Sequence, residues 1–207
     1  MYFIMTDKKI TKINLGAGPD GIVGWQNFDW GMLPFLAKFG LLDALVSFGF
    51  LAKEYKRVWP KFSLVDIRKK IPVNDKSVDF VYCSHVLEHF EKNETLRVLN
   101  EAKRVLKKGG TARFVLPDLD KIIKIKEADK MCRVWWGYDK DKLTGWKKYF
   151  IRGHQWLYSK KSFGQLLKEV GFSKIKFLEY KQGRVPDLDK LDLLIHRDLS
   201  FYVEVEK

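Results

Sequence analysis

The chain has 207 residues, which is enough for one domain with a sizeable hydrophobic core. Its apolar fraction of 46% excludes a disordered or fibrous class, and two cysteines, Cys83 and Cys132, supply neither a disulfide framework nor a metal-ligand cluster. Lys and Arg outnumber Asp and Glu by 39 to 26, but they are scattered, so the net charge of +13 indicates a solvated surface rather than a polyanion-binding tract. The chain shows no secretory signal pattern, and we expect a cytoplasmic protein.

Residues 12–15 are predicted to form the first strand, which runs directly into Gly16-Ala17-Gly18-Pro19. Glycines at this point let the backbone approach a ligand where a Cβ would clash. Gly16, Gly18 and Gly21 formally satisfy the dinucleotide pattern G-x-G-x-x-G. That pattern also requires a phosphate-binding helix and an acidic residue roughly 20 positions further on.

The second strand, predicted at residues 26–29, ends in Asp29 and leaves little room for such a helix after Gly21. A glycine turn with a nearby ribose-binding carboxylate, but without a phosphate cradle, is typical of a nucleoside-cofactor site. Among such cofactors, S-adenosylmethionine fits best.

Residues 32–59 are rich in Leu and Phe and are predicted to form a helical insertion. Lys38 and Asp43 interrupt the segment, and its longest uncharged run is too short to span a bilayer. We interpret it as a cover for the core or a lid over a substrate. A dimer contact and peripheral membrane contact through an interfacial helix are alternatives.

The third strand is predicted at residues 62–66 and, like the second, ends in a carboxylate, Asp66. Ligands of open α/β sheets bind at the carboxyl edge of the strands, near the topological switch point. Asp29 and Asp66 are therefore expected to converge on the ligand.

Two amphipathic helices and two closing strands are predicted further along. The first helix covers residues 93–108, capped by Asn93 and stopped by Gly109; the second follows the N-cap Ser159 and ends at Gly171. Residues 175–180 and 200–205 alternate as strands and suggest a hairpin-like finish. Because strands and helices alternate along the chain, we predict a parallel sheet with helices on both faces.

An aromatic-rich insertion is predicted at residues 132–152, between these helices. Its aromatic side chains are Trp135, Trp136, Tyr138, Trp146, Tyr149 and Phe150. Such side chains bind sugars and bases by stacking, and they equally form satellite hydrophobic clusters.

Three further motifs, together with the glycine turn, resemble class I S-adenosylmethionine-dependent methyltransferases. Residues 78–89 resemble the fourth strand and its following loop in that family. Residues 104–110 and 112–118 resemble the "RVLKPGG" helix end and fifth strand, with Lys108 in place of the proline. Residues 153–158 (Gly-His-Gln-Trp-Leu-Tyr) resemble a branch often associated with polysaccharide biosynthesis. The resemblance runs, with interruptions, from about residue 11 to the C-terminus.

This resemblance implies an α/β fold: a Rossmann-like three-layer sandwich with a mostly parallel seven-stranded sheet, in one domain over residues 1–207. It implies that the glycine turn lies beneath the methionine and ribose, that Asp29 binds the ribose hydroxyls, and that Asp66 and Ile67 meet the adenine. Ser84 and His85 would face the methionine end. Asn14 stands where many members carry an acidic residue, so the usual charge contact to the methionine amino group is missing there. The implied cofactor-binding residues are Asn14, Gly16, Ala17, Gly18, Asp29, Asp66, Ile67, Ser84 and His85.

Methyl transfer from a sulfonium is an in-line displacement, and a hydroxyl acceptor gains from a general base within hydrogen-bond reach. His85, beside the cofactor, and His154, expected to overhang the acceptor pocket, are the candidate bases. His89 is expected to orient its loop, and His196 to take part in a structural ion pair next to Arg197.

The sequence therefore predicts O-methylation of a small-molecule or glycan-linked acceptor. Two alternatives stay open: an RNA methyltransferase, suggested by the net charge, and a non-catalytic cofactor-binding regulator, suggested by Asn14. A DNA-base enzyme would carry an Asn/Asp-Pro-Pro-aromatic motif where residues 83–86 read Cys-Ser-His-Val. Neither cysteine follows a proline, and the chain has no P-loop and no run of zinc ligands.

Overall fold

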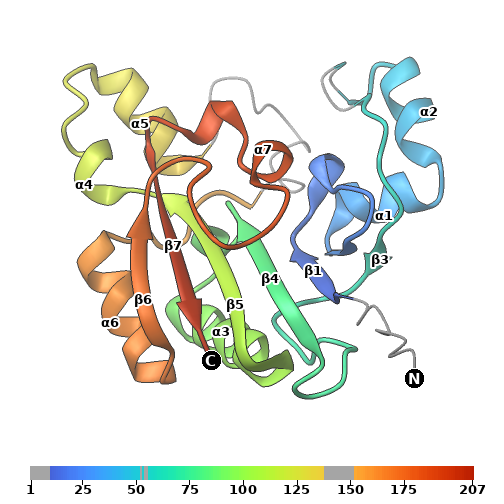
Figure 1. Ribbon diagram of the computed structural model, residues 1–207. Helices are drawn as coiled ribbons and strands as arrows, with labels where there is room; N and C mark the ends of the chain where they lie inside the picture. The colour runs from blue at the N-terminus through green and yellow to red at the C-terminus, as the bar shows by residue number, and fades with distance from the viewer. Residues whose placement is uncertain (1–9, 52, 54–55, 138–151) are drawn as a thin grey trace, which may run out of the picture.

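The structure is a computed structural model that describes residues 10–51, 53, 56–137 and 152–207 (Figure 1). Seven strands form one sheet in the order β3-β2-β1-β4-β5-β7-β6. The strands are β1 (Lys12–Leu15), β2 (Gln26–Asp29), β3 (Ser63–Leu64), β4 (Val78–Ser84), β5 (Leu106–Pro117), β6 (Ser173–Leu178) and β7 (Ser200–Glu206). Neighbours from β3 to β5 are parallel, whereas β7 runs antiparallel to both β5 and β6. This arrangement confirms the predicted fold class.

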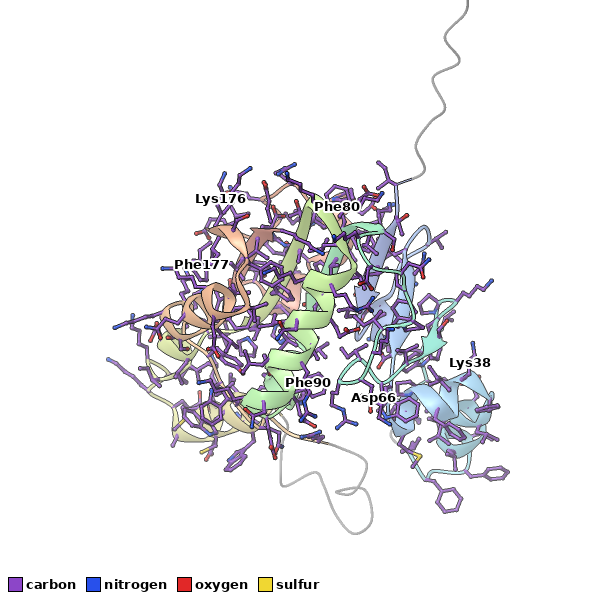
Figure 2. The ribbon with its side chains drawn as sticks, turned by 90° about the horizontal axis from the view of Figure 1, so that it is seen from below. Lys38, Asp66, Phe80, Phe90, Lys176 and Phe177 are labelled. Atoms are coloured by element: carbon purple, nitrogen blue, oxygen red, sulfur yellow. The ribbon has the colours of Figure 1, made fainter. Side chains whose placement is uncertain are left out.

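Helices flank the sheet on its two faces and at one end. They are α1 (Met32–Lys38), α2 (Leu41–Ser47), α3 (Lys92–Val105), α4 (Leu119–Ile122), α5 (Ala128–Trp136), α6 (Lys160–Val170) and α7 (Leu188–Leu191). Short 3₁₀ turns, η1 (Gly18–Asp20), η3 (Leu87–His89) and η6 (Leu194–His196), lie near the strand ends. The helices α3 and α6 pack side by side on one face over the main core (Figure 2). On the other face, α7 covers a smaller cluster around Tyr82 and Tyr202.

The helix α3 begins one residue before the predicted range, and its cap differs from the prediction. Glu91, not Asn93, is the N-cap, and it forms a capping box with Glu94. Reciprocal bonds between these side chains and the backbone satisfy two otherwise free N–H groups, which a lone Asn cap cannot do. The predicted ending at Gly109 was wrong, because α3 ends at Val105 and β5 begins at Leu106.

The helix α6 and the closing strands follow the prediction more closely. Ser159 caps α6 and accepts a hydrogen bond from the Ser162 N–H, while Gly171 ends the helix with a φ of +83°. The strands β6 and β7 pair antiparallel, as expected for a hairpin-like finish, but a long connection that contains α7 and η6 joins them.

A fully buried arginine ties that long connection to the sheet. Arg113, on β5, donates to the Asp192 carboxylate at 2.6 and 3.1 Å and to the backbone oxygen of Gln182 at 2.8 Å. Glu204, on β7, lies 3.4 Å from the same guanidinium. Both side chains of the Arg113–Asp192 pair are inaccessible to solvent. The connection is therefore held against the strands, and it carries η6 to their carboxyl edge.

The helices α1 and α2 lie at the β3 end of the sheet (Figure 1). Their inner faces form a separate small core with Leu36, Leu42, Val46 and Leu51. An exposed aromatic side chain follows each helix: Phe39, at 60% of full exposure, after α1 and Phe48, at 77%, after α2. None of the helices in the described ranges has the length and apolarity that a bilayer crossing needs. The role of residues 32–59 as an insertion stays a prediction.

Candidate functional site

The turn after β1 is fixed to the end of β2. The N–H groups of Gly16 and Ala17 both donate to the backbone oxygen of Phe28, at 2.8 and 3.1 Å. Gly16 has a φ of +70°, and a Cβ there would lie 2.2 Å from a methyl group of Val86. Gly18 has a φ of +55° and open space where its Cβ would project. Both positions therefore require glycine, one for close packing and one for backbone conformation.

Asp29, at the carboxyl end of β2, completes this anchor. Its Oδ2 accepts from the Gly18 N–H at 2.5 Å, and its Oδ1 accepts from the Trp30 N–H at 2.6 Å. Burial raises the pKa of Asp29 above its ordinary value of 3.8, although both hydrogen bonds oppose the rise. The result is a half-buried carboxylate held rigidly beside the glycine turn.

Two cavities meet at this turn. The smaller has a volume of about 180 Å³ and the larger about 760 Å³; Gly16, Gly18 and His85 line both. The larger volume lies within the roughly 300–1,000 Å³ usual for small-molecule sites. The two cavities therefore adjoin each other at the glycine turn and His85.

Besides Gly16, Gly18 and His85, the larger cavity is lined by three further predicted residues, Asp29, Asp66 and Ile67. Ile67 is buried, and Asp66 lies two residues beyond the short β3. Strand β3 is shorter than predicted, because it pairs with β2 only at Ser63 and Leu64. Asp66 receives two hydrogen bonds from the Arg68 side chain, at 2.8 and 2.9 Å, and this pairing lowers its pKa. Asp66 and Phe90, both labelled in Figure 2, lie in the wall of this cavity.

The smaller cavity contains Asn14, Ala17 and Ser84, and its lining also includes Asp20 and His196, two of the residues that sequence reasoning did not select. Asp20, in η1, contributes a carboxylate that also pairs with Arg57. Asn14 itself is buried, and its amide lies 3.5 Å from the side-chain oxygen of Asn27. Asp20 could have been found from sequence as the acidic residue nearest the glycine turn.

His196, on η6, is the second residue that was missed. The predicted ion pair is instead formed by its neighbours, Arg197 and Asp198, at 2.8 Å. The His196 ring stacks on His85 with centroids 3.6 Å apart and 20° between the ring planes. Burial, followed by the proximity of His85, lowers the pKa of His196 to about 4. His196 is therefore a neutral ring in the cavity wall at physiological pH.

His85 lies at the junction of the two cavities, in a left-handed backbone conformation with a φ of +52°. Its Nε2 lies 2.9 Å from the Ser200 hydroxyl, and its Nδ1 lies 3.0 Å from the Glu88 carboxylate. Burial alone would raise the pKa of Glu88, but His85 and His89 hold it below its ordinary value.

His154 does not line either cavity, although its neighbours do. His89, Arg152 and Gly137 contribute to the larger cavity, and the rings of His154 and His89 lie with centroids 5.1 Å apart. The His89 Nδ1 lies 2.7 Å from the Arg152 backbone oxygen, consistent with its expected role in orienting the loop. Burial lowers the pKa of His154. Residues 138–151 of the predicted aromatic insertion, which include Tyr138, Trp146, Tyr149 and Phe150, lie outside the described residues.

Comparison with known proteins agrees with the fold. A family model described as a methyltransferase domain matches residues 44–114. A possible histamine N-methyltransferase of Thermotoga maritima superposes with a TM-score of 0.55 at 15% identity, covering 95% of this chain and 81% of that one. An S-adenosylmethionine-dependent methyltransferase of Archaeoglobus fulgidus superposes with a TM-score of 0.53 at 13% identity, covering 97% of this chain and 87% of that one. The uncharacterized protein MJ1123 of Methanocaldococcus jannaschii is 29% identical over 69% of this chain, which spans 63% of that protein's length.

The methyltransferase-domain model covers about a third of the chain, and the fold is the one found in these S-adenosylmethionine-dependent methyltransferases. The glycine turn fits that cofactor. The open space at Gly18 is a cradle that a side chain would fill, and the fixed carboxylate of Asp29 stands beside it. No phosphate-binding helix follows the turn, because η1 has only three residues.

Proposed function

We propose that the domain methylates an oxygen of a small-molecule or glycan-linked acceptor. The observation that carries this proposal is the glycine turn, which Asp29 holds between two cavities that meet at His85. A ligand that bends over the turn would place its two ends in different cavities, with its centre beside His85.

The adenosine half would occupy the larger cavity. Asp29 would accept hydrogen bonds from the ribose hydroxyls, and Ile67 would pack against the adenine ring. Asp66 would accept from the exocyclic amine of the adenine while keeping part of its contact with Arg68, whose guanidinium also reaches Glu94 at 3.1 Å.

The methionine end would occupy the smaller cavity, with Asn14 and Ser84. Asn14 is neutral, so the positive amino group needs a carboxylate from elsewhere in the chain. Asp20 lines the same cavity and is the first acidic residue after the turn in the sequence. We assign the amino-group contact to Asp20, which would share its charge with Arg57.

S-adenosylmethionine supplies a sulfonium-activated methyl group, whose carbon–sulfur bond breaks as the acceptor oxygen attacks. The chain has to bring the acceptor into line and remove its proton. Of the two candidate bases, His85 lines both cavities and His154 lines neither. The Glu88 carboxylate lies beside Nδ1 of His85, which leaves Nε2 to take the acceptor proton. The Ser200 hydroxyl lies 2.9 Å from Nε2, so it would either move aside for the acceptor hydroxyl or relay its proton to Nε2.

The acceptor would enter through the outer part of the larger cavity. Trp30, 54% exposed, presents an aromatic face there, and such faces bind sugar rings, whereas the guanidinium groups of Arg68 and Arg152 already lie over the Phe90 ring. The segment 153–158, which resembles the polysaccharide-associated branch, runs beside this wall: the backbone N–H groups of Gln155 and Trp156 donate to the Glu88 backbone oxygen. These features favour a glycan-linked acceptor.

The test begins with calorimetric titration of the purified protein with S-adenosylmethionine and, separately, NAD. We expect micromolar binding of S-adenosylmethionine and none of NAD; NAD binding alone would overturn the cofactor assignment. Transfer of a radiolabelled methyl group is then screened on sugar and RNA acceptors. His85→Gln is expected to reduce turnover at least 100-fold while changing cofactor affinity less than about threefold, since general bases contribute roughly 10²–10⁴-fold. Equal losses in turnover and affinity would remove His85 from the base role.

A further inference from the structure

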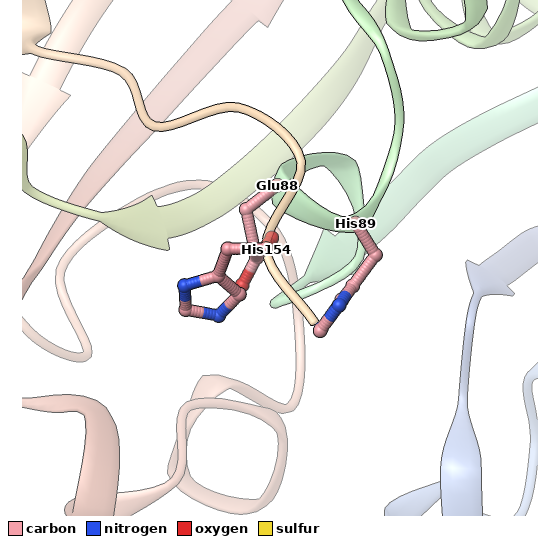
Figure 3. Close-up of side chains that lie close together, drawn as sticks. All are labelled: Glu88, His89 and His154. Atoms are coloured by element: carbon pink, nitrogen blue, oxygen red, sulfur yellow. The ribbon is translucent and has the colours of Figure 1, made fainter. Parts of the chain in front are cut away.

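The four histidines of the chain gather around one buried carboxylate. Glu88, in η3, is completely buried, and His85 and His89 are its near neighbours in sequence. His154 approaches it from a distant segment, and His196 stacks on His85. Figure 3 shows Glu88, His89 and His154 together.

The carboxylate of Glu88 lacks the partners that such a buried group normally has. Neither of its oxygens accepts a hydrogen bond of standard geometry. His85 Nδ1 lies 3.0 Å from Oε1, so Oε2 is the oxygen with no neighbouring donor among the described residues. Buried carboxylates are costly unless they are paired, hydrogen-bonded or bound to a metal. The Glu88 carboxylate can therefore still bind a cation.

Two of these histidines, His89 and His154, are held in the manner of metal ligands. The Nδ1 atom of His89 lies 2.7 Å from the backbone oxygen of Arg152, and the Nδ1 atom of His154 lies 3.1 Å from that of Trp135. A carbonyl can only accept, so each Nδ1 carries the proton and each Nε2 keeps its lone pair. Metal-binding histidines are almost always fixed by such a second hydrogen bond.

Glycine at position 137 leaves room beside one of these nitrogens. A Cβ at Gly137 would lie 2.4 Å from Nε2 of His154. One potential ligand atom from each of Glu88, His89 and His154 lies within 4.8 Å of the other two. Atoms bound to one Zn²⁺ lie about 3.3 Å apart, given bonds of about 2.0–2.1 Å in tetrahedral geometry. Small side-chain rotations would close this difference.

We propose that Glu88, His89 and His154 bind a divalent transition metal of the borderline class, with Zn²⁺ as the reference ion. Two imidazoles and one carboxylate form a donor set that suits such ions better than Mg²⁺ or Ca²⁺. Three protein ligands leave at least one coordination position for another ligand. His89 also lines the larger cavity, so the ion would lie in the wall of that cavity. Metal binding at this cluster does not depend on the assigned methyl transfer.

The test uses untagged protein stripped with a chelator. Calorimetry measures Zn²⁺ binding, and visible absorption of added Co²⁺ reports the coordination geometry. We expect one ion per chain, d–d absorption bands typical of a low-coordinate site, and a higher melting temperature with Zn²⁺. His154→Gln and Glu88→Gln are each expected to weaken binding at least about 100-fold, since even loss of an outer partner costs 10–100-fold.

His196→Gln is the matched control, because it removes a histidine of the same cluster that lies outside the three ligands. It should keep one Zn²⁺ per chain at an affinity within about threefold of the original. His154→Gln changes a surface segment, so it keeps the test valid if Glu88→Gln does not fold. No stoichiometric binding by the original protein would overturn the proposal. Binding that survives His154→Gln, or that His196→Gln abolishes equally, would also overturn it.

Discussion

Asp29→Asn is the sharpest perturbation of the proposed cofactor site, because it keeps the side-chain shape and removes one acceptor. The two oxygens of Asp29 each receive one backbone N–H, from Gly18 and Trp30. An Asn side chain has one oxygen, so in either orientation its NH₂ group faces one of these N–H donors. An unsatisfied, partly buried donor costs about 1–3 kcal/mol.

The Gly18 N–H bond to Asp29 fixes the glycine turn, and in the proposed site the ribose would bind the same carboxylate, so the loss should appear in cofactor affinity. At 1.4 kcal/mol for each factor of ten, we expect binding about 10- to 100-fold weaker. Calorimetry with S-adenosylmethionine and with methylthioadenosine, which lacks the amino-acid part, measures the effect. Both ligands carry the ribose, so both should weaken alike. Affinity within twofold of the original protein for either ligand would refute the placement of the ribose at Asp29.

Three other substitutions test separate parts of the reasoning. Asp20→Asn should weaken the binding of S-adenosylmethionine about tenfold and leave the binding of methylthioadenosine unchanged, because only the former has the amino group. An equal change in affinity for the two ligands would remove Asp20 from the site. Arg113→Met should lower the free energy of unfolding by about 3–5 kcal/mol in urea denaturation, since it leaves Asp192 buried without its ion pair; a change below about 1 kcal/mol would contradict this. His196 has a folded pKa of about 4, below its ordinary 6.5, so protonation favours the unfolded chain as pH falls through that window. His196→Gln should reduce the loss of unfolding free energy between pH 6.5 and 4, by less than about 3 kcal/mol because the ring reaches solvent. The same pH dependence in the variant and the original protein would contradict this role of His196.

The sequence predicts the first two strands to the residue, because local chemistry marks their ends. Glycines follow β1, and β2 is short and ends in a charged residue. The boundary between α3 and β5 was mistaken because Lys107 and Lys108 suit a helix end as well as a strand. Val78 pairs with Leu106 across the sheet, and that distant contact starts the strand at Leu106. Local propensity carries no record of such a partner.

The site shows the same division between local and distant information. Asp29 and Asp66 were predicted to converge because each follows a strand and strand ends meet at one edge of the sheet, and both line the larger cavity. His196 was missed because its position depends on the buried contact between Arg113 and Asp192, far away in the sequence. The grouping of Glu88 and His89 with His154 was missed for the same reason, since 64 residues lie between His89 and His154 and no ligand spacing is recognisable.

The distribution of charge around the cavities favours a neutral acceptor over a nucleic acid. The chain has a net charge of +13, yet no lysine is found among the described residues that line the two cavities. The three arginines of the larger cavity are all paired: Arg57 with Asp20, Arg68 with Asp66, and Arg152 with Glu94. Binding to a phosphate backbone needs Lys or Arg side chains that can pair with phosphates and displace the counterions of the nucleic acid. The affinity of such binding falls steeply with salt. An acceptor bound through hydroxyl groups and aromatic faces should instead keep its KM within about twofold between 50 and 200 mM salt. A fall in affinity of 10³-fold over that range would redirect the assignment toward RNA.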